Sequence, residues 1–159
     1  LSLYCYRVAG VVGLLAAQIF GYQDRKTQKY AHDLGIAFQL TNIIRDVGED
    51  ARRGRIYLPI EDLQRFGVTA ADILNARHSH DFRRLMEFQI ERAESYYTQA
   101  IGALPAVDRK AQRPGLVMAA IYRTLLEEIR RDGCQVLSQR TSLTPIRKLW
   151  IAWRTWARG

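Results

Sequence analysis

The stretch that decides the fold is residues 39–50, QLTNIIRDVGED. Its polar residues Gln39, Asn42, Asp46 and Asp50 are three, four and four positions apart. On a helix of ~3.6 residues per turn this spacing places them in one line. The residues between them are mostly apolar, so we expect this helix to be buried on several sides. A polar line within an apolar helix is informative, because buried polar groups need partners.

Asp46 and Asp50 lie one helical turn apart, and Glu49 adds a third carboxylate. Two carboxylates ~6 Å apart repel by about 3 kcal/mol at an effective dielectric near 20. Mg²⁺ would relieve this repulsion, because it binds oxygen ligands and often shares its sites with substrate phosphates. The competing interpretation is a solvated acidic face that only keeps the domain soluble. Spacing alone does not separate the two.

The loop that follows carries Arg52, Arg53 and Arg55 around Gly54. Guanidinium groups bind phosphate through two parallel hydrogen bonds. Acids that can hold a metal, followed by arginines that can hold a phosphate, predict a metal–diphosphate clamp. The alternative is that the arginines pair with the neighbouring carboxylates as a surface network.

Outward from this stretch the pattern is helical almost throughout. Helices are expected over residues 3–20, 25–50, 60–66, 79–101, 115–131 and 142–156, with Asp24 as an N-cap and a capping box at Thr69–Asp72. Gly54 and Pro59 predict a loop over residues 51–59. There is no strand alternation and no repeat. The 159 residues suit one domain with a real core. The sequence therefore predicts a single all-α domain over residues 1–159.

Lysine and arginine total 24 against 16 aspartate and glutamate, a net charge of +8. The excess suits an anionic partner: nucleic acid, an anionic membrane or a phosphorylated small molecule. The arginine-rich loop adjoins three carboxylates, which argues against nucleic acid. Cys5 and Cys134 form no CxxC motif, so a cytoplasmic, reducing location is expected. The longest apolar run, residues 8–17, is too short to span a bilayer.

Trp150, Trp153 and Trp156 recur every three residues near the end of the chain, interleaved with arginine and lysine. We favour the interpretation that they cover the end of the helical core. The alternative is a basic helix that lies on the inner membrane surface as a peripheral contact.

Three segments together resemble the squalene/phytoene synthase family. Residues 39–50 resemble its second aspartate-rich motif, residues 53–59 (RGRIYLP) the stretch after it, and residues 4–13 (YCYRVAGVVG) its Tyr-Cys and Val-Ala-Gly motif. The resemblance implies an isoprenoid-synthase-type helical bundle with a central substrate cavity. Within the family, residues 142–150 (SLTPIRKLW) look most like the bacterial presqualene diphosphate synthase branch of the hopanoid pathway, with phytoene synthase close behind.

The resemblance implies Mg²⁺-dependent, head-to-head condensation of two isoprenyl diphosphates. We rank farnesyl diphosphate to presqualene diphosphate or squalene first, and geranylgeranyl diphosphate to phytoene next. NADPH would take part only if the product is squalene. The alternative is a catalytically inactive family member that acts as an assembly factor or a membrane-associated interaction protein.

The resemblance also assigns roles. Asp46 and Asp50 would be catalytic ligands of Mg²⁺, supported by Glu49. Tyr4 would lie near the reacting carbons as a proton acceptor or cation stabiliser. The substrate-binding positions comprise two amides beside the metal, two arginines on the diphosphate and a glycine that makes room for the prenyl tail: Gln39, Asn42, Arg45, Arg55 and Gly10.

Family members carry a first aspartate-rich motif well upstream of the Tyr-Cys segment, and no such motif precedes Tyr4 here. We therefore expect the chain to be the C-terminal portion of a longer enzyme. It would hold half of a two-sided metal site and would be inactive unless the other half is supplied.

Overall fold

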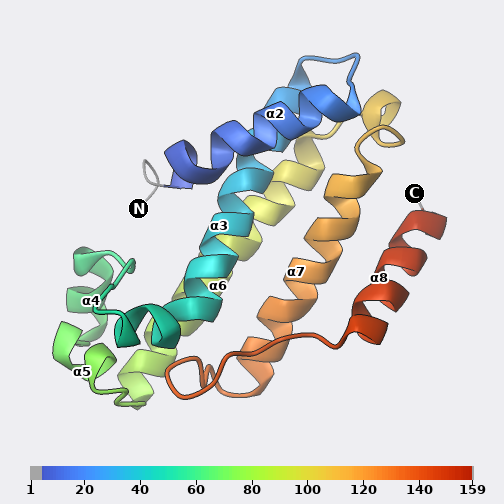
Figure 1. Ribbon diagram of the computed structural model, residues 1–159. Coiled ribbons are helices and arrows are strands. Elements are labelled where there is room, and N and C mark those ends of the chain that lie inside the picture. The colour runs from blue at the N-terminus through green and yellow to red at the C-terminus, as the bar shows by residue number, and fades with distance from the viewer. Residues whose placement is uncertain (1–4, 159) are drawn as a thin grey trace.

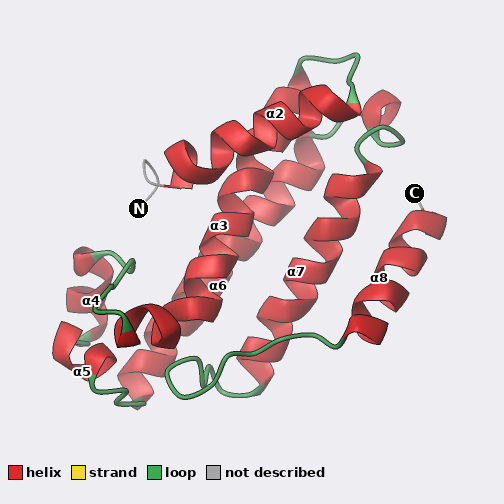
Figure 2. Ribbon diagram, in the orientation of Figure 1, coloured by secondary structure: helices red, strands yellow, loops and turns green. Residues whose placement is uncertain are grey.

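The computed structural model describes residues 5–158. Within that range the chain consists of helices and loops, without strands (Figure 2), which confirms the predicted all-α class. In chain order the elements are η1 (a π-helical turn, Tyr6–Gly10), α2 (Val11–Phe20), α3 (Lys26–Arg52), α4 (Ile60–Phe66), α5 (Ala70–Leu74), α6 (His80–Ala103), η2 (a 3₁₀ turn, Ala106–Asp108), α7 (Arg113–Arg131) and α8 (Pro145–Arg158).

The long helix α3 is the centre of the bundle. It packs along α6, is crossed near its beginning by η1 and α2, and contacts α7 from Tyr30 onward (Figure 1). Helix α8 packs on α7 at the edge of the molecule, and α4 and α5 lie at the end of α3. This arrangement explains why α3 is apolar on several sides: most of its surface is covered by other helices.

Local signals set several helix ends, and the capping box that opens α5 was predicted. The Thr69 hydroxyl accepts the Asp72 backbone N–H while the Asp72 carboxylate accepts from Thr69, a complete capping box. The Ser79 side chain caps α6 by accepting a hydrogen bond from Phe82 N at 3.0 Å. Gly67 ends α4 with a φ of 69°, in the left-handed region that glycine adopts readily.

The sequence predicted Asp24 as the N-cap of α3, and this prediction is wrong. The N-cap is Arg25, whose side chain makes no capping hydrogen bond. The Asp24 carboxylate accepts the Lys26 backbone N–H at 2.8 Å. It therefore satisfies one free N–H of the first turn from one residue earlier.

The turn between α2 and α3 is tied to η2 by the buried side chain of Asp108. Its carboxylate accepts hydrogen bonds from Gln23 N at 2.7 Å, Asp24 N at 3.1 Å and Thr27 Oγ1 at 2.6 Å. Burial alone would raise the pKa of Asp108, but these three donors hold it below its ordinary value. The start of α3 and the approach to α7 are thereby joined.

Candidate functional site

The predicted polar line exists on α3. The four side chains are half-buried while Ile43 and Val47 between them are buried, so the line follows one side of an otherwise covered helix. Its members are Gln39, Asn42, Asp46 and Asp50.

Asp46 is held by two arginines. Arg45 donates from Nε to Oδ1 at 2.7 Å and from Nη2 to Oδ2 at 2.5 Å, and Arg140 donates from Nε to Oδ1 at 2.9 Å. Burial would raise the pKa of the Asp46 carboxyl, but the hydrogen bonds from Arg45 and Arg140 outweigh it and lower the pKa. Asp46 is therefore ionised at neutral pH.

Glu49 lies between two arginines as well. Arg53 donates to its Oε1 at 2.8 Å, which is the surface pairing that the sequence left open, and Arg140 Nε lies 3.5 Å from its Oε2. Arg140 thus bridges Glu49 and Asp46 and partly neutralises both.

Asp50 takes part in none of the ion pairs formed by the described residues. Burial raises its pKa, and the negative charge of Asp46 one turn away raises it further. An added cation near both carboxylates would offset this repulsion, which is the role that the sequence led us to expect of Mg²⁺.

The three predicted metal ligands are not gathered around one point. No group of three or more histidine, cysteine, aspartate or glutamate side chains within residues 5–158 is arranged to hold a metal ion. Glu49 pairs with Arg53, and Asp46 pairs with Arg45 and Arg140, so Asp50 alone of the three lies outside the ion pairs of the described residues. The assignment of Asp46, Glu49 and Asp50 as joint ligands stays a prediction.

Sequence reasoning missed Arg140, which lies 94 residues from Asp46 and reaches it on the loop between α7 and α8. Gly48 makes this approach possible. Its N–H donates to Val136 O at 3.2 Å, and a side chain at position 48 would overlap the carbonyl oxygens of Val136 and Leu137. A glycine in the interior of a helix, amid three acids, was the available signal.

Arg140 also helps to form a basic hollow beside the acids. The hollow has a volume of about 340 Å³ and lies between α3, α7 and the α7–α8 loop. Arg45, Arg140 and Lys148 contribute three cations to its wall, and Tyr122 lies beside Arg45. Such a wall favours an anion with several acceptor oxygens.

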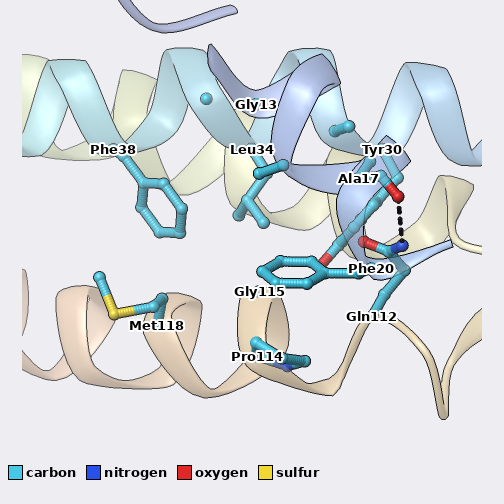
Figure 3. A pocket seen from close by; sticks show the side chains of 13 residues that line it. Gly13, Ala17, Phe20, Tyr30, Leu34, Phe38, Gln112, Pro114, Gly115 and Met118 are labelled. Carbon is cyan, nitrogen blue, oxygen red and sulfur yellow. Dashed lines mark hydrogen bonds between the residues drawn. The ribbon is translucent and has the colours of Figure 1, made fainter.

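An apolar cavity of about 180 Å³ lies further toward the beginning of α3 (Figure 3). It is bounded by α2, α3 and α7, and Leu34, Phe38 and Met118 project into it. Met118 lines the basic hollow too, so the two spaces follow one another along the groove between α3 and α7. At their junction the rings of Phe38 and Tyr122 lie 5.0 Å apart, centroid to centroid.

Glycines allow the wall of the cavity to close. A side chain on Gly13 would overlap the Ala31 carbonyl oxygen, and one on Gly35 would overlap the Ala9 carbonyl oxygen and press on Gly10. The first helical segment therefore packs closely against α3. Gly13, rather than Gly10, faces the cavity.

The other predicted site residues lie in different places. Arg55 is exposed and lies near Asp50, where its charge opposes the rise in the Asp50 pKa. Gln39 and Asn42 belong to the polar line of α3, but they border neither the apolar cavity nor the basic hollow. Their contact with substrate stays a prediction. Tyr4 lies outside the described residues.

The tryptophans do not cover the end of the core, so the favoured prediction for them is wrong. Trp150, Trp153 and Trp156 are 53%, 69% and 54% exposed. Ile151 is the buried residue of α8, whereas the Trp156 ring reaches α7 at Arg113, whose guanidinium carbon lies 5.3 Å from the ring centroid. Arg154 stacks over Trp150, with its guanidinium carbon 4.8 Å from the ring centroid. None of the described helices has the length and apolarity to cross a bilayer.

Comparison with known proteins fits this geometry. The model of the squalene/phytoene synthase family matches residues 1–147. The phytoene synthase of Arthrospira platensis is 44% identical over 94% of this chain and 52% of its own length. The 15-cis-phytoene synthase of Enterobacter agglomerans is 40% identical over 92% of this chain and 50% of its own.

Solved structures agree. A dehydrosqualene synthase matches with a TM-score of 0.83 and 31% identity, covering 99% of this chain and 56% of its own. The squalene synthase HpnC from Alicyclobacillus acidocaldarius matches with a TM-score of 0.73 and 28% identity, covering 84% and 51%. The chain spans about half the length of the relatives it matches. By motif order, by fold and by the extent of the match, the chain belongs to the squalene/phytoene synthase family.

Proposed function

We propose that the full-length protein condenses two isoprenyl diphosphates head to head in a Mg²⁺-dependent reaction. One observation carries this proposal: an apolar cavity and a hollow lined in part by Arg45, Arg140 and Lys148 follow one another along α3 and α7, and the two arginines of the hollow contact Asp46. A prenyl tail needs the first space and a diphosphate the second.

The chain's own residues have separable tasks. Leu34, Phe38 and Met118 provide an apolar surface for the tail and keep water from the reacting carbons. Arg45 and Arg140 would donate to the diphosphate oxygens, moving part of their hydrogen bonding from Asp46 to the substrate. Asp46 and Asp50 would hold Mg²⁺, which when bound supplies positive charge for the departing diphosphate.

In the proposed reaction the allylic C–O bond of one substrate breaks and its electron pair leaves with the diphosphate. The double bond of the second substrate supplies the pair for the new C–C bond, and a proton is lost as a cyclopropyl diphosphate forms. Arginines that are already in place lower the barrier, because they need no reorganisation when the charge develops. Tyr4 is the proposed proton acceptor by family resemblance.

We rank geranylgeranyl diphosphate to phytoene first, because the relatives matched by sequence are named phytoene synthases. This reverses the order that residues 142–150 suggested. Farnesyl diphosphate to presqualene diphosphate or squalene is second, supported by the names of the structural neighbours. NADPH belongs only to the squalene outcome.

The test is to incubate the full-length protein with each diphosphate, with Mg²⁺ or EDTA, and with or without NADPH. Mass spectrometry should find phytoene from geranylgeranyl diphosphate with Mg²⁺ alone. Tight binding of substrate analogues without any product would favour the alternative, an inactive family member that acts through interactions. No binding and no product would refute both.

A further inference from the structure

Tyr30 lies at the end of the apolar cavity that is farthest from the acids. It precedes Asp46 by sixteen residues on α3, a distance of ~24 Å along the helix axis at ~1.5 Å per residue. From α3 its side chain extends across the cavity toward α7 (Figure 3). The cavity therefore has an aromatic side chain at the end that is farthest from Asp46.

The Tyr30 ring is held between two helices. The side chain is only 1% exposed, and its tip meets the backbone of α7 at Gly115, where an added side chain would overlap the hydroxyl. The hydroxyl has no hydrogen-bond partner among the described residues. A buried hydroxyl without a partner costs free energy, so hydrogen bonding does not explain a tyrosine at this position, whereas the space that it fills does.

The structure around Tyr30 is firmly held. The Gln112 side chain, also buried, donates from Nε2 to Gly21 O at 2.9 Å and to Ala17 O at 3.2 Å, which ties the start of α7 to the end of α2 (Figure 3). Asp108 ties the α2–α3 turn to η2 in the same region. Hydrogen bonds therefore tie together the segments that form the end wall of the cavity.

We propose that Tyr30 is a specificity-determining residue: it closes the cavity and sets the longest isoprenyl chain that fits. The inference rests on the proposed function. A chain longer by one isoprene unit would have to enter the space that the Tyr30 ring occupies, because Tyr30 and the anchored start of α7 lie at the far end of the cavity. Selection by length follows from excluded volume and needs no polar contact, which agrees with the unpartnered hydroxyl.

Truncation of the side chain tests this. In the full-length protein, Tyr30→Ala and the milder Tyr30→Leu open the far end, whereas Tyr30→Phe keeps the ring. Tyr96→Ala is the matched control, because Tyr96 is a partly buried tyrosine on α6 that lies outside this cavity. Each variant is titrated with thiodiphosphate analogues of C15, C20 and C25 isoprenyl chains, and kcat/KM is measured for the three diphosphates.

Tyr30→Ala and Tyr30→Leu should raise the preference for the chain one unit longer than the wild type's best substrate by about tenfold or more, in both binding and kcat/KM. Tyr30→Phe and Tyr96→Ala should keep the wild-type preference. If a folded, active Tyr30→Leu protein keeps the wild-type preference for chain length, the role of Tyr30 in setting the longest chain is overturned and the proposed function is left intact. A wild type that binds none of the three analogues would overturn the proposed function, and with it the role of Tyr30 in setting chain length.

Discussion

The hydroxyl of Tyr30 lies where a side chain on residue 115 would have to be, so Tyr30 and Gly115 are matched across the gap between α3 and α7. The phenol fills the gap only because α7 has no side chain at that point. The two positions should therefore be coupled in stability.

Tyr30→Phe should raise the free energy of unfolding by about 1 kcal/mol, because it removes a buried hydroxyl that has no partner. Gly115→Ala should lower it by about 1 to 3 kcal/mol, since the added methyl group meets that hydroxyl. Urea denaturation of the full-length single and double variants measures the coupling. Gly115→Ala should lower the free energy of unfolding much less when it is combined with Tyr30→Phe. Strictly additive changes in that free energy would contradict the coupling between positions 30 and 115.

When Mg²⁺ is absent, neutralising Asp46 and neutralising Asp50 should change the stability of the fold in opposite directions. The folded-state pKa of Asp46 is lowered, so its stabilisation is present above its unfolded pKa of about 3.9 and is lost as the pH falls through the folded value. The folded-state pKa of Asp50 is raised, so folding is favoured below the unfolded pKa and that advantage is lost as the pH rises through the folded value.

At neutral pH, Asp46→Asn should therefore lower the Tm and Asp50→Asn should raise it. Both differences should shrink as the pH falls through the acidic range. With Mg²⁺ and pyrophosphate present, the Tm of Asp50→Asn should no longer exceed that of the wild type. The bound cation would offset the repulsion between Asp46 and Asp50 in the wild type. Thermal melts over a pH series check this, with Asp81→Asn on the exposed start of α6 as the control. A lower Tm for Asp50→Asn than for the wild type without metal would contradict the inference that the charge of Asp50 destabilises the fold.

Arg140→Gln should weaken pyrophosphate binding by about tenfold or more, since a charge-assisted hydrogen bond is worth about 1.5 to 3 kcal/mol. Titration calorimetry in the presence of Mg²⁺ measures the loss. Arg84→Gln, which removes an exposed arginine paired with Asp81, should leave binding unchanged. Equal effects of the two substitutions would mean that only net charge matters.

Gly48→Ala should reduce pyrophosphate binding without touching a charged group. The added methyl group would displace the carbonyls of Val136 and Leu137 and carry the Arg140 loop away from Asp46. Combining it with Arg140→Gln should add little further loss, because both changes remove the same contact. Full additivity in calorimetry would argue that the loop acts in some other way.

The exposed tryptophans of α8 should bind anionic membranes, as the alternative interpretation of the sequence predicts. Sedimentation of the full-length protein with vesicles that contain phosphatidylglycerol should fall when Trp153 and Trp156 become serine. Neutral phosphatidylcholine vesicles are the control. If sedimentation is unaffected and the Tm drops instead, another part of the protein covers this face.

The sequence predicted what depends on local spacing. The line from Gln39 to Asp50, the capping box at Thr69 and the stop at Gly67 each follow from a few neighbouring residues. Arg140 could not be predicted, because its position near Asp46 depends on how a distant loop packs on Gly48. The tryptophan error has a related cause: periodicity shows which residues share a face of a helix, and packing decides whether that face is covered.

The contact between Gly48 and the Arg140 loop also orders events during synthesis. At ~5–20 residues per second, a ribosome needs roughly 5 to 20 s to add the 94 residues that separate Asp46 from Arg140. Throughout that delay the nascent acidic helix lacks the arginine that later bridges Asp46 and Glu49. A nascent chain can therefore form α3 well before Arg140, the residue that bridges its two acids, has been synthesised.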